Sequence, residues 1–335
     1  MRLSSLGYKR WEGQSTGIWT RRWVITKTGI DLCLKSKLLK IVIALSWCVS
    51  LIAIPVYFTL GQMLSPESGL MGYLSGVFGE RFYQAITGLM SWLLLYPEIC
   101  VNGIYRATFY QMMIGHMAFS FLAVSLFVPK LISHDMSSQA IVIYNSKALT
   151  RFDYMIGKFG IVFLILSFMW VAPTIFAWFV GNLLSPDWSF FVHSFDAVAT
   201  SVLVGLVGVV ALSCIALAVS ALAKRTSTAV TMWIFISVMS VPISVIMKFV
   251  AGGWGAYLNF YYAIYSLGHS LLNLGQVLLD AQNMLPFFSF WMPPFSERDL
   301  DTLPMFQRDV VGPSVMLAIF VSISLLIISK KVKPQ

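Results

Sequence analysis

Charged side chains are scarce in this sequence of 335 residues. Asp, Glu, Lys and Arg make up only 11% of the chain, less than half of the share of about 25% found in soluble domains. With 58% hydrophobic residues and a mean hydropathy of +0.79, the chain has too few polar groups to cover a water-facing surface. This composition argues against a soluble enzyme, a disordered protein or a nucleic-acid-binding module, and it predicts an integral membrane protein.

The sequence also lacks the usual patterns of metal, disulfide and nucleotide sites. Its four cysteines, Cys33, Cys48, Cys100 and Cys214, show neither paired spacing nor a Cys-x-x-Cys motif, and its four histidines are widely scattered. No Gly-x-x-x-x-Gly-Lys-(Ser/Thr) loop is present to hold the phosphates of ATP. We therefore expect no metal, no cofactor and no catalytic residue in this chain.

Long apolar runs, by contrast, are abundant. A bilayer core about 30 Å thick needs about 20 helical residues to cross it. Six uncharged runs fit this length: Ile41–Leu60, Met112–Val128, Phe159–Val180, Ala197–Ala223, Thr228–Met247 and Val310–Ser329. Backbone amides in hydrocarbon must bond internally, so we predict an all-α protein with six transmembrane helices. Without charges at depth, a proton- or sodium-coupled transporter is not favoured, because such transporters need titratable or coordinating groups near the midplane.

Positive charge is concentrated in the segments that alternate crossings place on one side of the membrane. If the chain begins in the cytoplasm, the inner segments 1–40, 129–158, 224–227 and 330–335 hold 18 of the 23 Lys and Arg residues. The same segments hold only 4 of the 14 acidic residues. This is the positive-inside pattern, so we predict that both termini are cytoplasmic.

Two further apolar stretches, Phe82–Pro97 and Trp254–Leu279, have an ambiguous position. A full crossing at the first would turn the basic loops that follow to the outside, which the charge pattern disfavours. We therefore predict two outer-face excursions, 61–108 and 251–309, each with a re-entrant or interfacial helical piece.

Isolated polar residues near the spans are expected to have structural roles. Glu98 and Arg106 fall in the first outer excursion, where water or a mutual pair can satisfy them. His116 is expected one turn from the outer end of its span, as a hydrogen-bonded packing residue. Small residues on the fourth span are expected to pack inside the bundle, because close approach of helices needs them: Gly205, Gly208, Ala211, Ser213, Ala216, Ala218, Ser220 and Ala221.

Residues 1–37 form a polar, basic leader, and residues 38–330 form the six-span transmembrane domain. Between Ile18 and Leu39, tryptophans and aliphatic residues are interleaved with cations. This mixture is typical of a helix lying at the anionic inner leaflet. A basic stop flanking the first span is the other interpretation, and both can hold. Because the first apolar run starts only at residue 41, we expect no cleavable signal peptide.

The first long inner loop, 131–157, is the most informative segment. Ser133 or Asp135 suits the N-cap of a short helix, and the apolar block Ala140–Tyr144 lies on that helix. A short helix with an exposed apolar block could dock into a groove of another protein. An amphipathic connector resting on lipid explains the same pattern, and the residues alone leave both interpretations open.

This loop resembles the signature of ABC-2-type permeases, the integral membrane subunits of ABC exporters. The matching positions are Leu131, Ile132, Ser133, Asp135, Ser146, Lys147, Leu149, Thr150, Arg151, Tyr154, Gly157 and Lys158. The stretches Tyr8–Gly13 and Arg21–Ile25 are similar to the leader of one bacterial branch of the family, and the six-span layout matches too. The chain departs from the family at Gln139 and Ala148, where Gly and Pro are common, and both changes should reshape the turns.

The resemblance implies a permease subunit of an ATP-driven exporter in the bacterial inner membrane. A separate cytoplasmic ABC ATPase, in two copies, would bind ATP and Mg²⁺, grip the short helix around 135–146 and tilt the attached spans. A second permease copy or a homologous permease would complete the pathway among membrane lipids. The residues expected to couple to the ATPase are Ser133, Asp135, Ile141, Val142, Ile143, Tyr144, Leu149, Arg151, Tyr154 and Lys158.

Two other functions share some of these features. A non-transporting membrane anchor, or a mechanotransmission subunit of an ATPase complex, would use the same docking loop. A membrane-embedded lipid-modifying enzyme would need a cluster of His, Asp and Glu at an interface, and no cluster of the usual spacing is present in the sequence. The substrate does not follow from the sequence.

Overall fold

The computed structural model describes residues 17–63, 94–138, 150–185, 188–284 and 308–332, together with positions 76, 77, 79, 87, 91 and 306. Within these residues the regular structure is entirely helical. Six helical stretches are long and apolar enough to cross a membrane: Lys37–Gln62, Pro97–Ser137, Arg151–Leu183, Ser189–Leu222, Thr226–Ala251 and Val311–Lys331. Each coincides with one of the predicted runs, so the predicted all-α architecture with six potential membrane spans is confirmed.

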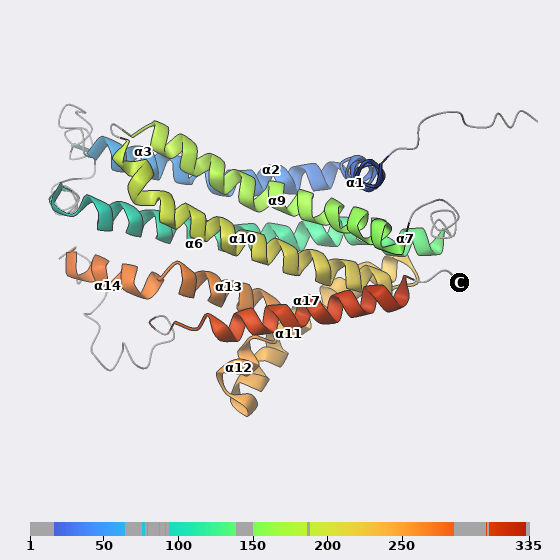
Figure 1. The fold of residues 1–335 in the computed structure, drawn as a ribbon. Coiled ribbons are helices and arrows are strands. Elements are labelled where there is room, and N and C mark those ends of the chain that lie inside the picture. The colour runs from blue at the N-terminus through green and yellow to red at the C-terminus, as the bar shows by residue number, and fades with distance from the viewer. Residues whose placement is uncertain are drawn as a thin grey trace, which may run out of the picture.

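The bundle is organised around α10 (Ser189–Leu222). This helix is the most buried of the six spans and packs against α6 (Pro97–Phe127), α9 (Arg151–Leu183) and α17 (Val311–Lys331). Helix α7 (Ile132–Ser137) and the end of α17 lie at one end of the bundle, and α14 (Leu274–Met284) lies at the opposite end (Figure 1). We call these the α7 end and the α14 end.

The small residues of α10 have the packing role predicted for them. All eight are buried. Gly208 lies between Trp170 of α9 and Ile264 of α13 (Phe260–Leu271), and an added Cβ atom would come within 2.9 Å of the indole ring. The missing side chain therefore lets two neighbouring helices approach α10 closely.

The first span consists of two helices, α2 (Lys37–Leu51) and α3 (Ala53–Met63). The break falls at Ile52, and Pro55 lies in the first turn of α3. Proline is tolerated there because amides in the first turn of a helix have no intrahelical acceptor.

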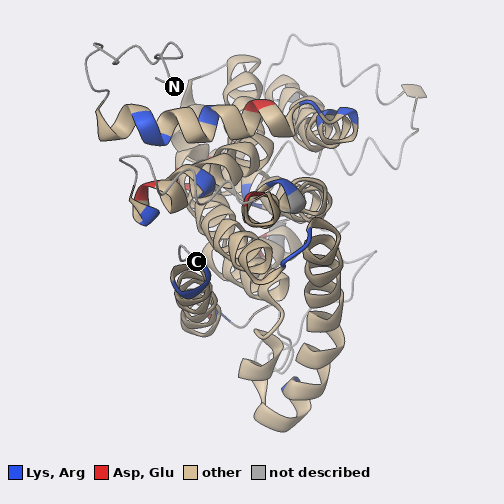
Figure 2. Ribbon diagram, turned by 90° about the vertical axis from the view of Figure 1, so that its right-hand side faces the viewer, with Lys and Arg blue, Asp and Glu red and all other residues tan. Residues whose placement is uncertain are grey.

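Helix α1 (Ile18–Cys33) runs across the bundle at the α7 end. Figure 1 looks along its axis, whereas Figure 2 shows it lying crosswise, with Lys and Arg along it. It packs on α9, and its Trp19 and Trp23 side chains are exposed. A helix is therefore present within the predicted leader, and it lies crosswise to the spans.

Helix α11 (Thr226–Ala251) diverges from the bundle, with α12 (Gly253–Ala256) at its far end (Figures 1 and 2). The chain then returns through α13, which packs against α6, α10 and α17, and through α14 (Leu274–Met284), which packs against α6. The helical pieces predicted for the second excursion are therefore present, and they pack within the bundle. Residues 285–305 of that excursion lie outside the described residues.

The structure describes the last part of the predicted first excursion, residues 94–108. Helix α6 begins at Pro97 and runs without a break into the second span, so residues 97–108 are helical and continuous with it. On this helix, the Arg106 guanidinium forms an ion pair with Asp196 and donates a hydrogen bond to the Leu272 carbonyl (3.1 Å). Its partner is therefore Asp196 rather than Glu98, which is exposed.

Candidate functional site

Half of the ten residues predicted to couple to an ATPase lie in the described part of the chain. Ser133 and Asp135 are on α7, and Arg151, Tyr154 and Lys158 are on the first turns of α9. The remaining five, Ile141, Val142, Ile143, Tyr144 and Leu149, lie outside the described residues.

Asp135, Tyr154 and Lys158 meet in one buried group, which we call the Asp135 cluster. Lys158 Nζ lies 2.7 Å from Asp135 Oδ2, and the Tyr154 hydroxyl donates a hydrogen bond of 2.7 Å to the same oxygen. The Lys158 ammonium also donates to the Leu131 carbonyl at 3.2 Å. The cluster therefore joins α7, and the residue preceding it, to α9.

The cluster is suited to holding helices together rather than to acid–base chemistry. The side chains of Lys158 and Asp135 are only 8% and 11% exposed, so both charges are largely removed from water. Such charges must be paired, and here each has its partner within hydrogen-bonding distance. Loss of either partner would leave a buried charge uncompensated.

Ser220 of α10 binds the start of α7 through hydrogen bonds. The sequence predicted only a packing role for this residue. Its Oγ accepts hydrogen bonds from the amides of Ile132 (3.0 Å) and Ser133 (3.1 Å). The same hydroxyl donates to the Val128 carbonyl at 2.9 Å. Ser220 lies on α10, so one buried hydroxyl ties the end of α6 and the start of α7 to the central helix. Its serine side chain within a run of small residues was the only signal in the sequence.

Arg151 does not join the cluster. It is the first residue of α9 and its side chain is exposed. Asp153, two residues later, instead closes a capping box with Thr150, in which each side chain accepts from the other residue's amide (3.2 and 3.1 Å). This exchange satisfies backbone donors that would otherwise be unpaired at the start of α9.

A second connection joins α9 to α1. The Arg22 guanidinium lies 2.6 Å from Asp153 Oδ1, and the Thr26 hydroxyl donates to the Gly157 carbonyl at 3.0 Å. An added Cβ atom at Gly157 would come within 2.7 Å of Ile25, so the glycine allows α1 to lie directly on α9. Gly157 matches the inner-loop signature, and this close approach gives the match a physical reason. The partnership of Arg22 was not predicted.

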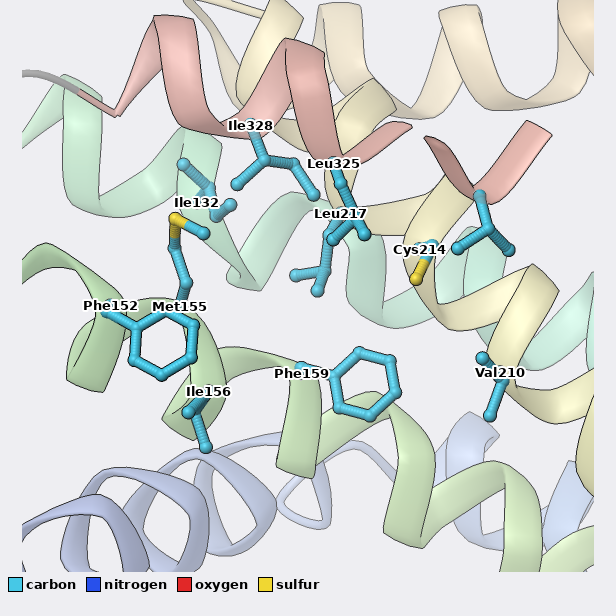
Figure 3. A pocket seen from close by; sticks show the side chains of 11 residues that line it. Ile132, Phe152, Met155, Ile156, Phe159, Val210, Cys214, Leu217, Leu325 and Ile328 are labelled. Carbon is cyan, nitrogen blue, oxygen red and sulfur yellow. The ribbon is translucent and has the colours of Figure 1, made fainter. Parts of the chain in front are cut away.

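An apolar pocket of about 300 Å³ adjoins α7 (Figure 3). Ile132 of α7 and Ile328 of α17 line one side, and Phe152 and Met155 of α9 line the opposite side (Figure 3). The pocket leaves unfilled volume beside α7, in contrast to the polar contacts that hold this helix.

Polar contacts connect the residues before α17 to α13 and to Tyr257, which follows α12. The Tyr257 hydroxyl donates to Asp309 Oδ2 at 2.6 Å, and the Asp309 amide donates to Ser270 at 3.2 Å. Burial, together with the neighbouring Asp309 carboxylate, raises the pKa of Tyr257 to about 12. Tyr257 therefore remains a neutral hydrogen-bond donor at physiological pH.

His116 lies inside the bundle, on a helix that is longer than the predicted span. Helix α6 extends 19 residues before it, and the side chain is fully buried. Ser46 Oγ donates its hydrogen to the Met169 carbonyl (2.6 Å), so His116 Nδ1, 3.1 Å from Ser46 Oγ, must donate to that oxygen. Nε2 of the neutral ring then accepts from Ser50 at 3.0 Å. His116 is thus hydrogen-bonded and packed between helices, as expected.

Among the described residues, no group of three or more His, Cys, Asp or Glu side chains is placed to hold a metal ion. No protein-family model and no curated protein sequence matches the chain.

Proposed function

We propose that this chain is the membrane-spanning subunit of an ATP-driven transporter of the ABC-2 exporter type. The inner-loop signature and the basic leader support the family. The charge distribution supports an orientation in which the α7 end faces the cytoplasm of a bacterium, since 18 of the 23 Lys and Arg residues fall in the segments on that side. Figure 2 looks at this end and shows Lys and Arg on several of its elements.

The observation on which the proposal depends is the set of polar contacts that hold α7 against α9 and α10. The Asp135 cluster links this helix to α9, and Ser220 links it to α10, the most buried span. A partner that pushes or pulls on the loop after α7 would therefore move two spans together. The apolar pocket beside Ile132 gives α7 room to shift without first displacing a packed side chain.

The power would come from a cytoplasmic ABC ATPase that binds ATP and Mg²⁺. Two copies of this ATPase would grip the inner loops of two permease chains, either a second copy of this chain or a homologous permease. In this arrangement the chain supplies the pathway and the helices that move, and the ATPase supplies ATP hydrolysis.

Co-purification with an ATPase encoded by a neighbouring gene tests the docking step. Replacing Ile141, Val142 and Ile143 together by Asp should abolish co-purification and leave membrane insertion intact, because a docking face would lose its apolar surface. Replacing the exposed Ser227 and Ser329 by Asp adds charge at the same end of the bundle but outside this loop, and it should leave co-purification unchanged. A triple variant that still binds the ATPase at the wild-type level would contradict the proposal.

Orientation is tested by cysteine accessibility in a background without the native cysteines. A cysteine at Ser138 should react with a membrane-impermeant reagent only from the cytoplasmic side, and a cysteine at Ser75 only from outside. The reverse result at either position would overturn the topology. Transport by the purified chain alone in vesicles without nucleotide would overturn the dependence on an ATPase.

A further inference from the structure

A second cavity with an apolar lining is formed by residues of α2 and α9 and of α1 and its C-terminal cap. Its volume is about 700 Å³. Its lining includes Ile30 of α1, Leu34 at the C-cap of α1, and Ile43 of α2. The residues that α9 contributes are Leu164, Ile165, Ser167, Phe168, Val171, Ala172 and Ile175.

The depth of this cavity matches one leaflet of a bilayer. Helix α1 lies across the bundle and meets α9 where Gly29 touches Ile161, three residues before Leu164. From Leu164 to Ile175 the cavity follows α9 for about 16 Å at 1.5 Å per residue. Half of a bilayer core is about 15 Å thick. A crosswise helix at the surface therefore covers a groove that extends to the middle of the membrane.

The lining of this cavity combines exposed apolar side chains with one cation, Lys40. Leu164, Phe168 and Ile175 are exposed, so it opens laterally toward the surroundings of the bundle. Lys40 lines the rim, is exposed and forms no ion pair with any described residue. In the sequence, Lys27, Lys35 and Lys37 precede Lys40, with Asp31 as the one acidic residue among them.

We propose that this cavity binds an anionic phospholipid of the leaflet that faces the α7 end. One acyl chain fills the groove along α9, and the headgroup phosphate lies at Lys40. Charge complementarity selects the occupant, because a net positive rim over an apolar groove suits an anionic lipid better than a neutral one or an apolar protein segment. The proposal depends on membrane insertion but not on the transport function or on an ATPase.

Native mass spectrometry of the chain extracted into detergent with equal amounts of phosphatidylglycerol and phosphatidylcholine tests this inference. The wild type should retain phosphatidylglycerol preferentially. Ala172→Trp, which fills the groove, should lose that retained lipid. Ala107→Trp is the matched control, since Ala107 lines a separate cavity of about 430 Å³ between α3 and α6 and its substitution should leave retention unchanged.

Lys40→Gln is a second test in the same experiment, and it does not require the protein core to accept a tryptophan. Loss of one cation near the headgroup should lower the preference for phosphatidylglycerol about fivefold. Lys248→Gln, at the other end of a span, should not change it. Equal retention of both lipids by the wild type, unchanged retention in Ala172→Trp or an unchanged preference in Lys40→Gln would each overturn the proposal. So would equal lipid loss from the two tryptophan variants.

Discussion

Replacing Lys158 by Met tests the Asp135 cluster directly, because it removes the charge and keeps an unbranched side chain of similar reach. The change deletes the 2.7 Å ion pair with Asp135 and the 3.2 Å hydrogen bond to the Leu131 carbonyl. Asp135 would then keep the Tyr154 hydroxyl as its remaining partner in the cluster. Removing one member of a buried ion pair costs about 3–5 kcal/mol. We expect Lys158→Met to lower the free energy of unfolding by that amount.

Unfolding in mixed micelles, followed by circular dichroism, measures this loss. Lys330→Met is the control, since Lys330 is exposed at the same end and its loss should cost less than about 0.5 kcal/mol. The double variant Asp135→Leu with Lys158→Met should be more stable than Lys158→Met alone, because it also removes the unpaired carboxylate. If Lys158→Met unfolds like the control, or if the double variant loses the sum of both single losses, the cluster does not hold α7 as described.

Three further outcomes follow from single contacts. Ser220→Ala leaves two buried amides without their acceptor and should cost about 1–3 kcal/mol in the same assay. Ser213→Ala should cost less, because its buried hydroxyl has no partner among the described residues, and an equal loss would refute the anchoring role of Ser220. Gly157→Ala should lower the midpoint of thermal unfolding, since its Cβ would come within 2.7 Å of a side chain of α1. In Gly103→Ala the nearest atom is 3.6 Å away, so equal midpoints would argue against the tight packing of α1 on α9. Burial lowers the pKa of His269, so the folded state binds fewer protons than the unfolded state, and stability should fall as the pH drops below about 6.5. His269→Gln should reduce that fall, and an unchanged pH profile would contradict it.

The spans were predictable because hydrocarbon imposes one rule on every residue within it. Uncharged runs of sufficient length must be helical, and each predicted run lies within or at the edge of a long apolar helix. The start of α6 was not predictable in this way. Arg106 suggested a segment outside the membrane, and its partner Asp196 is 90 residues away in the sequence. Local composition carries no information about such a pair.

The candidate site was predictable in its members but not in its contacts. Resemblance pointed to Asp135, Tyr154 and Lys158, and the structure shows that one carboxylate oxygen receives both other side chains. Ser220 and Arg22 were missed because their partners are 87 and 131 residues away. A serine among small residues and an arginine in a basic leader have ordinary explanations in the sequence. Only the folded chain distinguishes them from their neighbours.

Helix α9 is held at its start from two directions. Asp153 and Lys158 are five residues apart, which places them about 140° apart around the helix axis. One binds Arg22 of α1, and the other binds Asp135 of α7. A displacement of α7 would therefore reach α1 through α9, and it would reach α10 through Ser220. Helix α11 is the least buried of the six spans and diverges from the bundle. The polar connections among the described residues thus transmit a force applied at α7 to α1, α9 and α10, in addition to α6, with which α7 forms one helical stretch.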